Sequence, residues 1–124
     1  MKKYFIVMLM LNSICFASGI DKVVASCNDA KSELIDLGKN ETKGYKKDSM
    51  KIDIIMRDKK VFVKSNSGES ELIYIGGKNE QFIEEIASGH KALYTLFKKQ
   101  KLLTIQKSYD FFGPIMVNTY LKCK

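Results

Sequence analysis

The sequence predicts a mainly β protein in which an N-terminal helix leads into an antiparallel meander of about seven short strands, folded as a small barrel or sandwich. Apolar and polar residues alternate with a period of two from Met50 onward, which is the period of a strand with one buried face. Turn residues recur between these segments at the short spacing typical of sandwiches and barrels. Before Met50 the apolar residues lie three and four positions apart, so an α+β arrangement is also open.

The first element, residues 1–19, has the three parts of a secretory signal peptide. The positive start is Lys2-Lys3, and the apolar run begins with Tyr4–Leu11. Small residues follow at Ala17–Gly19. The apolar core is shorter than the roughly 20 residues that a membrane-spanning helix needs, so we expect export rather than a membrane anchor or a buried helix.

Cleavage is expected between Ala17 and Ile20, which leaves a β-rich domain of residues 20–124 in the periplasm or outside the cell. A lipid anchor on Cys15 is the less favoured alternative, because the bulky Ile14 precedes it where a small residue is needed. We expect no membrane span in the mature chain.

The cysteines of the mature chain form a pair. Cys15 leaves with the signal peptide, so Cys27 and Cys123 remain, and in an exported chain such a pair predicts a disulfide. A bridge that closes nearly the whole domain stabilises it by about 4–5 kcal/mol in the chain-entropy model. Redox catalysis is the alternative, but the sequence has no Cys-x-x-Cys motif.

The segment after the signal peptide shows the helical period. Its apolar residues are Ile20, Val23, Val24, Cys27, Ala30, Leu34 and Leu37. Asp21 is a candidate cap at the start of this helix and Gly38 at its end. A break at Ser26–Asn28 would instead leave a short strand and a shorter helix. Lys39–Ser49 is polar and rich in lysine, and we expect a loop there.

The remaining chain predicts strands separated by polar turns. The expected strands are Met50–Met56, Val61–Val63, Leu72–Ile75, Gln81–Ala87, Ala92–Phe97, Leu102–Ser108 and Ile115–Lys122. Gln81–Ala87 also fits one turn of a helix, because its apolar residues suit both periods. The only proline, Pro114, precedes the last strand, where its missing N–H costs no ladder bond.

The residues offer little catalytic chemistry. His90 is the only histidine and lies in a glycine-containing turn, where a solvated side chain is the expected role. Glu84 and Glu85 are adjacent and would point to opposite faces of a strand, so they cannot form the facing pair of a glycosidase. No nucleophile elbow or phosphate-binding glycine loop is present in the sequence. We therefore expect a non-enzymatic protein without cofactor or metal.

The charge of the chain suggests its partners. The formal charge is +7, and all but one of the 21 basic residues are lysine, the exception being Arg57. Lysine lacks the bidentate fork that reads phosphates specifically, and export removes the protein from nucleic acid. We expect no nucleic-acid partner, but an unknown protein or an anionic polymer of the cell envelope.

Two loops carry the candidate binding residues. One is the Ser88–Lys91 turn, and the other is the Tyr109–Pro114 segment, which has more aromatic residues than a turn requires. This aromatic segment would either cover one end of the barrel or present a binding edge. The candidates are Ser88, Gly89, His90, Tyr109, Phe111 and Phe112.

The C-terminal part of the chain also carries a family resemblance. Its pieces are Phe82-Ile83-Glu84, Ser88-Gly89, Leu93–Phe97, Leu103-Thr104, Lys107–Asp110, Tyr120 and Cys123. Together they resemble small exported proteobacterial proteins of unknown function. The resemblance implies a periplasmic β-rich domain with an end-to-end disulfide, and it implies no activity.

A more distant similarity is to the periplasmic lysozyme-inhibitor barrels, which have a Ser-Gly loop and a disulfide. Here no tyrosine follows Ser88-Gly89 at their interval, and their second lysine-glycine motif is absent. The leading expectation is therefore an envelope-associated binding module. The alternatives are an inhibitor of a hydrolase such as lysozyme, and a small barrel that binds an apolar ligand.

Overall fold

The computed structural model describes residues 20–47, 50–86, 89–110 and 113–124, and the side chains of 45–47 are not among what is described. The predicted signal peptide, its cleavage site and the alternative lipid anchor lie outside these residues. The described residues form nine strands: β1 Lys22–Asp36, β2 Glu41–Lys47, β3 Ile52–Arg57, β4 Lys60–Ser65, β5 Gly68–Tyr74, β6 Glu80–Glu85, β7 Lys91–Phe97, β8 Leu102–Asp110 and β9 Pro114–Cys123. The described part of the chain contains no helix.

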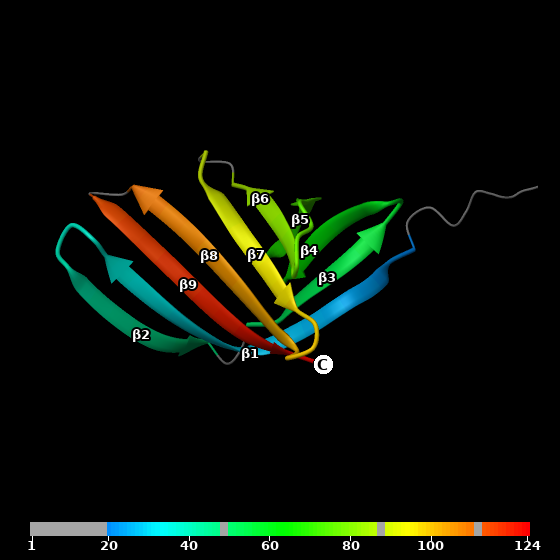
Figure 1. Cartoon of the computed structure of the whole chain (residues 1–124), viewed down its shortest axis with the longest axis horizontal. Helices are drawn as coiled ribbons and strands as arrows, with labels where there is room; N and C mark the ends of the chain where they lie inside the picture. Colours follow the sequence, from blue (N-terminus) through cyan, green and yellow to red (C-terminus); the bar gives the residue numbers. More distant parts are fainter. Residues whose placement is uncertain (1–19, 48–49, 87–88, 111–112) are drawn as a thin grey trace, which may run out of the picture.

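The strands form an eight-stranded antiparallel closed barrel with β2 as one extra strand (Figure 1). β1 pairs with β3, each strand from β3 to β8 pairs with the next, and the β1–β9 pairing closes the ring. The predicted meander of strands is confirmed, because the seven expected segments correspond to β3 through β9. Of the two predicted architectures, the barrel is the one observed.

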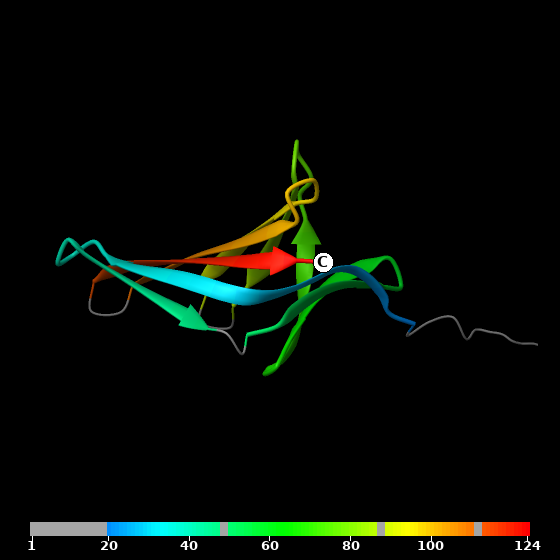
Figure 2. The ribbon, with the colours of Figure 1, turned by 90° about the horizontal axis from the view of Figure 1, so that it is seen from below.

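The long strand β1 closes the barrel by changing partners along its length. Its first part, Lys22–Cys27, pairs with β3, and its second part, Cys27–Asp36, pairs with β9 on the other edge. On the edge opposite β9, this second part of β1 pairs with β2. As a result β1, β2, β8 and β9 extend to one side of the barrel (Figure 2).

The predicted N-terminal helix is wrong, because this segment is β1. Ala25 and Cys27 are buried two positions apart, and so are Ala30 and Ser32, but three positions separate Cys27 from Ala30. A β-bulge causes this offset: the register with β9 shifts after Asn28, and Asp29 has a φ of 60°. Two strand periods joined by a bulge therefore imitate the three- and four-residue steps of a helix.

The predicted loop at Lys39–Ser49 is also wrong over most of its length. A turn around Asn40, which has a φ of 58°, leads into β2, and β2 pairs with β1 from Glu41 to Lys47. Residues 41–44 are exposed. Since β2 lies outside the barrel and buries no face there, it lacks the apolar alternation that identified the other strands.

The segment Gln81–Ala87, which fitted both periods, is strand in β6. Phe82 faces the core with 3% of its surface exposed, whereas Ile83 next to it lies on the outer face. Strand β5 is longer than predicted, because it already begins at Gly68 inside the expected turn. Pro114 does begin the last strand, and its carbonyl accepts a hydrogen bond from the N–H of Leu37.

The barrel interior is an apolar core. A disulfide links β1 to β9 at the point where β1 changes partners. The most buried side chains of the core include Ile54, Leu103, Leu121 and Cys27. Cys27 and Cys123 lie directly opposite each other in the β1–β9 register and are bonded, so the predicted disulfide is confirmed. The bridge links positions 96 residues apart in the sequence.

Candidate functional site

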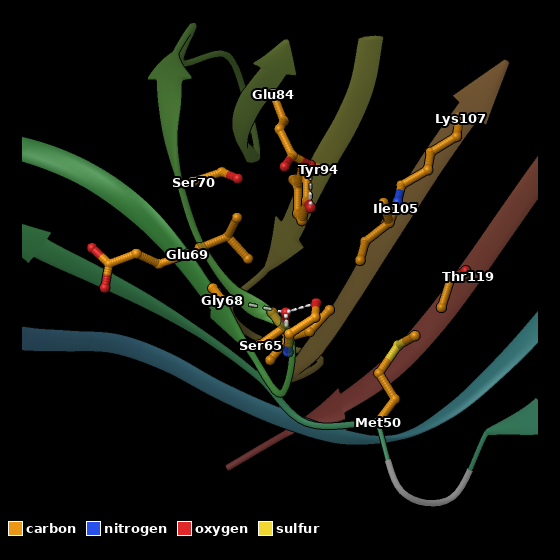
Figure 3. Close-up of a pocket in the computed structure, with 13 residues that line it drawn as sticks. Met50, Ser65, Gly68, Glu69, Ser70, Glu84, Tyr94, Ile105, Lys107 and Thr119 are labelled. Carbon is orange, nitrogen blue, oxygen red and sulfur yellow. Dashed lines mark hydrogen bonds between the residues drawn. The ribbon is translucent and has the colours of Figure 1, made fainter. Parts of the chain in front are cut away.

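A cavity of about 320 Å³ opens at one end of the barrel, and we call it the mouth cavity. Side chains from β3 to β9 and from the chain just before β3 surround it (Figure 3). Its lining residues are Met50, Ile52, Val63, Ser65, Ser67, Gly68, Glu69, Ser70, Glu84, Tyr94, Ile105, Lys107 and Thr119. The volume lies at the lower end of the range for small-molecule sites, roughly 300–1,000 Å³.

The strand period explains how polar residues reach the barrel interior. Glu84 is two positions after the buried Phe82 on β6, and Lys107 is two positions after the buried Ile105 on β8. Because every second residue of a strand faces the same side, both charged side chains point inward at the end of their strands. The same alternation turns Glu85 outward, as the sequence predicts for two adjacent glutamates.

Tyr94 forms the polar centre of the mouth cavity. Its ring is buried, with 4% of the residue exposed, and its hydroxyl donates a 2.7 Å hydrogen bond to Oε1 of Glu84 (Figure 3). Burial, and then the hydrogen bond to the carboxylate, raises the pKa of Tyr94 well above its usual value. The phenol therefore stays neutral and keeps donating to Glu84 throughout the physiological pH range.

The wall of the barrel is incompletely paired beside this cavity. Strands β5 and β6 are in register at only two positions, Ile73 with Ile83 and Tyr74 with Phe82, within the described residues. The first part of β5, Gly68–Leu72, pairs with β4 but has no ladder partner among the described residues on the β6 side. We call this junction the β5–β6 seam. Ser70 and Glu84 line the cavity from its two sides.

The hairpin between β4 and β5 contributes hydroxyl groups to the rim. Oγ atoms of Ser65 and Ser67 lie 3.0 Å apart in a hydrogen bond, and Gly68 follows with a φ of 140°, which favours glycine. On the opposite wall, Thr119 shares a buried 2.9 Å hydrogen bond with Ser32 of β1. The rim is therefore polar, whereas the floor is made by apolar side chains.

A second carboxylate, Glu69, lines the cavity but is turned away from it (Figure 3). It accepts a 2.8 Å hydrogen bond from Arg57, which also binds Asp21 at 2.7 Å and lies over the ring of Phe62. This arginine lowers the pKa of both carboxyl groups. Glu84 is thus the carboxylate that faces the cavity among the described lining residues.

The structure brings two of the predicted binding residues together. The rings of His90 and Tyr109 lie 5.2 Å apart and tilted by 53°, a normal aromatic contact between the β6–β7 turn and the end of β8. Tyr109 therefore lies in a strand, not in the expected loop. Gly89 has a φ of 90° in the turn before His90, and its N–H donates to Ile86. None of these three lines the mouth cavity. Ser88, Phe111 and Phe112 lie outside the described residues.

Another cavity, of about 390 Å³, lies among the turns at the ends of β5, β7 and the start of β6. Its lining is Lys78, Asn79, Glu80, Leu96, Lys98, Lys99 and Gln100. Lys98 is paired with Glu80 at 2.9 Å, and its side chain is 64% exposed. Since this cavity is formed largely by exposed turn residues, the mouth cavity is the better candidate site.

None of the residues that line the mouth cavity is among the binding residues predicted from the sequence. Tyr94 and Lys107 enter that prediction only as parts of the expected strands Ala92–Phe97 and Leu102–Ser108. The sequence did contain one indication of the cavity. Glu84 and Lys107 each follow a buried apolar residue by two positions, so each charged side chain is expected on the inner face of its strand. Which strands face one another across a cavity depends on closure of the ring, and a single sequence does not show that.

Across the ranges that the structure describes, no group of three or more histidine, cysteine or acidic side chains is placed to hold a metal ion. Those ranges also contain no helix long and apolar enough to span a membrane. Comparisons with protein-family models, curated proteins and solved structures found no match.

Proposed function

We propose that this chain is a non-enzymatic, exported binding protein that holds its ligand in the mouth cavity. The observation that carries the proposal is the construction of this cavity: a polar rim with Glu84, Tyr94 and Lys107, above a floor of core side chains. Such a combination of an apolar floor and a few placed polar groups is typical of ligand sites. The disulfide fits an oxidising compartment, as export requires.

The interior favours a small ligand over a long apolar one. Below the mouth cavity the barrel is filled, because Ile54 and Leu103 are fully buried and Leu121 is 1% exposed. A long acyl chain would need a channel through this layer. The alternative of an apolar-ligand barrel is therefore less well supported than a site for a compact molecule with polar groups.

Native mass spectrometry of protein purified without denaturation tests this function. The wild type should carry a bound species that disappears after unfolding and refolding. Ser70→Phe, which places a ring in the mouth cavity, should abolish that species. Ser108→Phe is the matched control, because Ser108 is exposed on the outside of β8 and should leave the bound species unchanged. A wild type without any bound species, or with one that Ser70→Phe does not displace, would contradict the proposal.

Inhibition of a hydrolase is the second candidate, favoured by the contact between His90 and Tyr109, which brings together one residue from each of the two segments expected to bind a partner. If this function holds, stoichiometric amounts of the protein reduce muramidase activity, and His90→Ala with Tyr109→Ala relieves the inhibition. Unchanged activity across several types of lysozyme would exclude it.

A further inference from the structure

Two opposite charges face the mouth cavity from one cross-strand row. Glu84 on β6 lies opposite Ala92 on β7, and Ala92 lies opposite Lys107 on β8. Neighbouring strands are about 4.8 Å apart, so the backbones of Glu84 and Lys107 are separated by roughly 10 Å. Ala92 is 1% exposed and its methyl group is short, so the two longer side chains flank the cavity above it.

These two charges do not neutralise each other. Glu84 accepts the hydroxyl of Tyr94, and none of the ion pairs among the described residues includes Glu84 or Lys107. The ammonium of Lys107 makes no hydrogen bond to any described residue. The cavity therefore presents one anionic and one cationic group whose capacity for charge-assisted hydrogen bonds is largely unused.

Between and below these charges the surface is apolar. Met50, Ile52, Val63 and Ile105 form this part of the lining. A complementary ligand has an ammonium group for Glu84, a carboxylate for Lys107 and an apolar side chain for the floor. We propose that the mouth cavity binds a small apolar zwitterion, supplied either as a free α-amino acid or as a short peptide; this inference rests on the proposed function.

A short peptide would have additional partners at the β5–β6 seam. On the side toward β6, the backbone of Gly68–Leu72 has no ladder partner within the part of the chain that the structure describes, and Ser70 from this stretch lines the cavity. Unpaired strand edges bind extended peptides through main-chain hydrogen bonds. A dipeptide is therefore expected to bind more tightly than a free amino acid if peptides are the source.

The test uses four probes: leucine, N-acetylleucine, leucinamide and leucyl-leucine. Each is titrated into ¹⁵N-labelled wild-type protein, and amide chemical shifts give the dissociation constant. Leucine should shift residues of the mouth cavity, such as Tyr94 and Ile105. N-acetylleucine lacks the ammonium and leucinamide lacks the carboxylate, so each should bind roughly 10-fold more weakly or worse. The comparison of leucine with leucyl-leucine separates the two sources.

Variants assign each charge to its partner. Lys107→Gln should remove the preference for leucine over leucinamide without changing the affinity for leucinamide. Glu84→Gln should remove the preference for leucine over N-acetylleucine. Glu85→Gln and Lys91→Gln are matched controls, because these exposed residues lie on the outer face of β6 and β7 and should retain both preferences.

Equal affinity for leucine and its two neutralised derivatives would overturn the inference, and so would variants that keep the wild-type preferences. Failure of all four probes to bind would overturn it too. The proposed function fails separately, through native mass spectrometry, because that measurement does not depend on the identity of the bound species.

Discussion

The barrel has two seams that differ in how firmly they hold the ring closed. At the junction of β1 and β9, eight pairs of residues are in register and a disulfide joins the strands. At the β5–β6 seam only two pairs of described residues are in register, and the mouth cavity lies beside the rest of β5. The chain thus fixes the junction between its two ends covalently and leaves the wall beside its candidate site incompletely paired.

This difference indicates where the molecule opens. Local opening is easiest where backbone hydrogen bonds are few and exposed, and binding sites are commonly taken from such regions. Because the disulfide holds β1 and β9 together, the strands can separate locally at the β5–β6 seam while the ring stays closed at β1–β9. Hydrogen-bonded amides of β9 are expected to exchange with solvent more slowly than those of Glu69–Leu72.

The largest expected effect on stability comes from removing the disulfide between β1 and β9. Replacing both Cys27 and Cys123 with alanine should lower the free energy of unfolding by about 4–5 kcal/mol, because the unfolded chain regains the entropy of a loop that spans 96 residues of sequence. Urea unfolding of both proteins measures the difference. Reductant should destabilise the wild type and leave the double variant unchanged. A loss below about 1 kcal/mol would show that the strand pairing alone holds this seam.

A smaller effect on stability is expected beside the β5–β6 seam, at the hydrogen bond between Tyr94 and Glu84. Tyr94→Phe removes the donor to Glu84, and the cost should be about 1–2 kcal/mol, since the carboxylate can take water in its place. Thermal and urea unfolding measure it. The leucine titration of the same variant shows whether the hydroxyl also positions Glu84 for a ligand. Stability equal to that of the wild type would mean that the phenol is not needed to hold the carboxylate.

The pKa of Tyr94 adds a pH dependence to this comparison. Because the folded-state pKa is raised above the ordinary value of 10.0, the stabilisation is fully present below pH 10.0 and is lost as the pH rises further. The wild type should therefore lose more stability than Tyr94→Phe between neutral and strongly alkaline pH. Parallel alkaline curves for the two proteins would contradict this assignment.

The smallest effect is expected at Arg57, which connects the two regions by binding Asp21 before β1 and Glu69 on β5. These groups are exposed to solvent, so Arg57→Gln should reduce stability only slightly. Both carboxyl pKa values are lowered in the fold, so their contribution is present at neutral pH and is lost as the pH falls below the ordinary values of 3.8 and 4.5. Wild type and variant should differ at pH 7 and converge in acid; a difference that persists in acid would exclude the ion pairs as its cause.

The strands that form the barrel wall could be predicted well from the sequence, and those with unusual pairing could not. In Leu102–Ser108 the buried Leu103 and Ile105 are two positions apart, so the alternation is plain. In β1 the bulge at Asp29 breaks the alternation, and β2 buries no face along residues 41–44. The disulfide was predictable because the chain expected after removal of residues 1–19 offers only one pairing of cysteines.

The mouth cavity was not among the sites predicted from the sequence, for a physical reason. The binding residues expected from composition include His90 and Tyr109, whose rings are in contact but do not line this cavity. The mouth cavity combines side chains from strands far apart in the sequence, such as Ser70 and Lys107. Their proximity depends on the curvature and closure of the sheet, which alternation along one strand does not encode.

The position of the C-terminus has a practical consequence for how the protein can be attached to a surface. The N–H of Cys123 donates to the carbonyl of Lys101 in the β7–β8 turn, while Lys107 lines the mouth cavity six residues further along β8. At about 3.4 Å per residue, the last residue therefore lies roughly 20 Å from the cavity along this strand. An anchor or fusion partner joined after Lys124 would therefore be attached at a distance from the cavity and would leave its opening accessible.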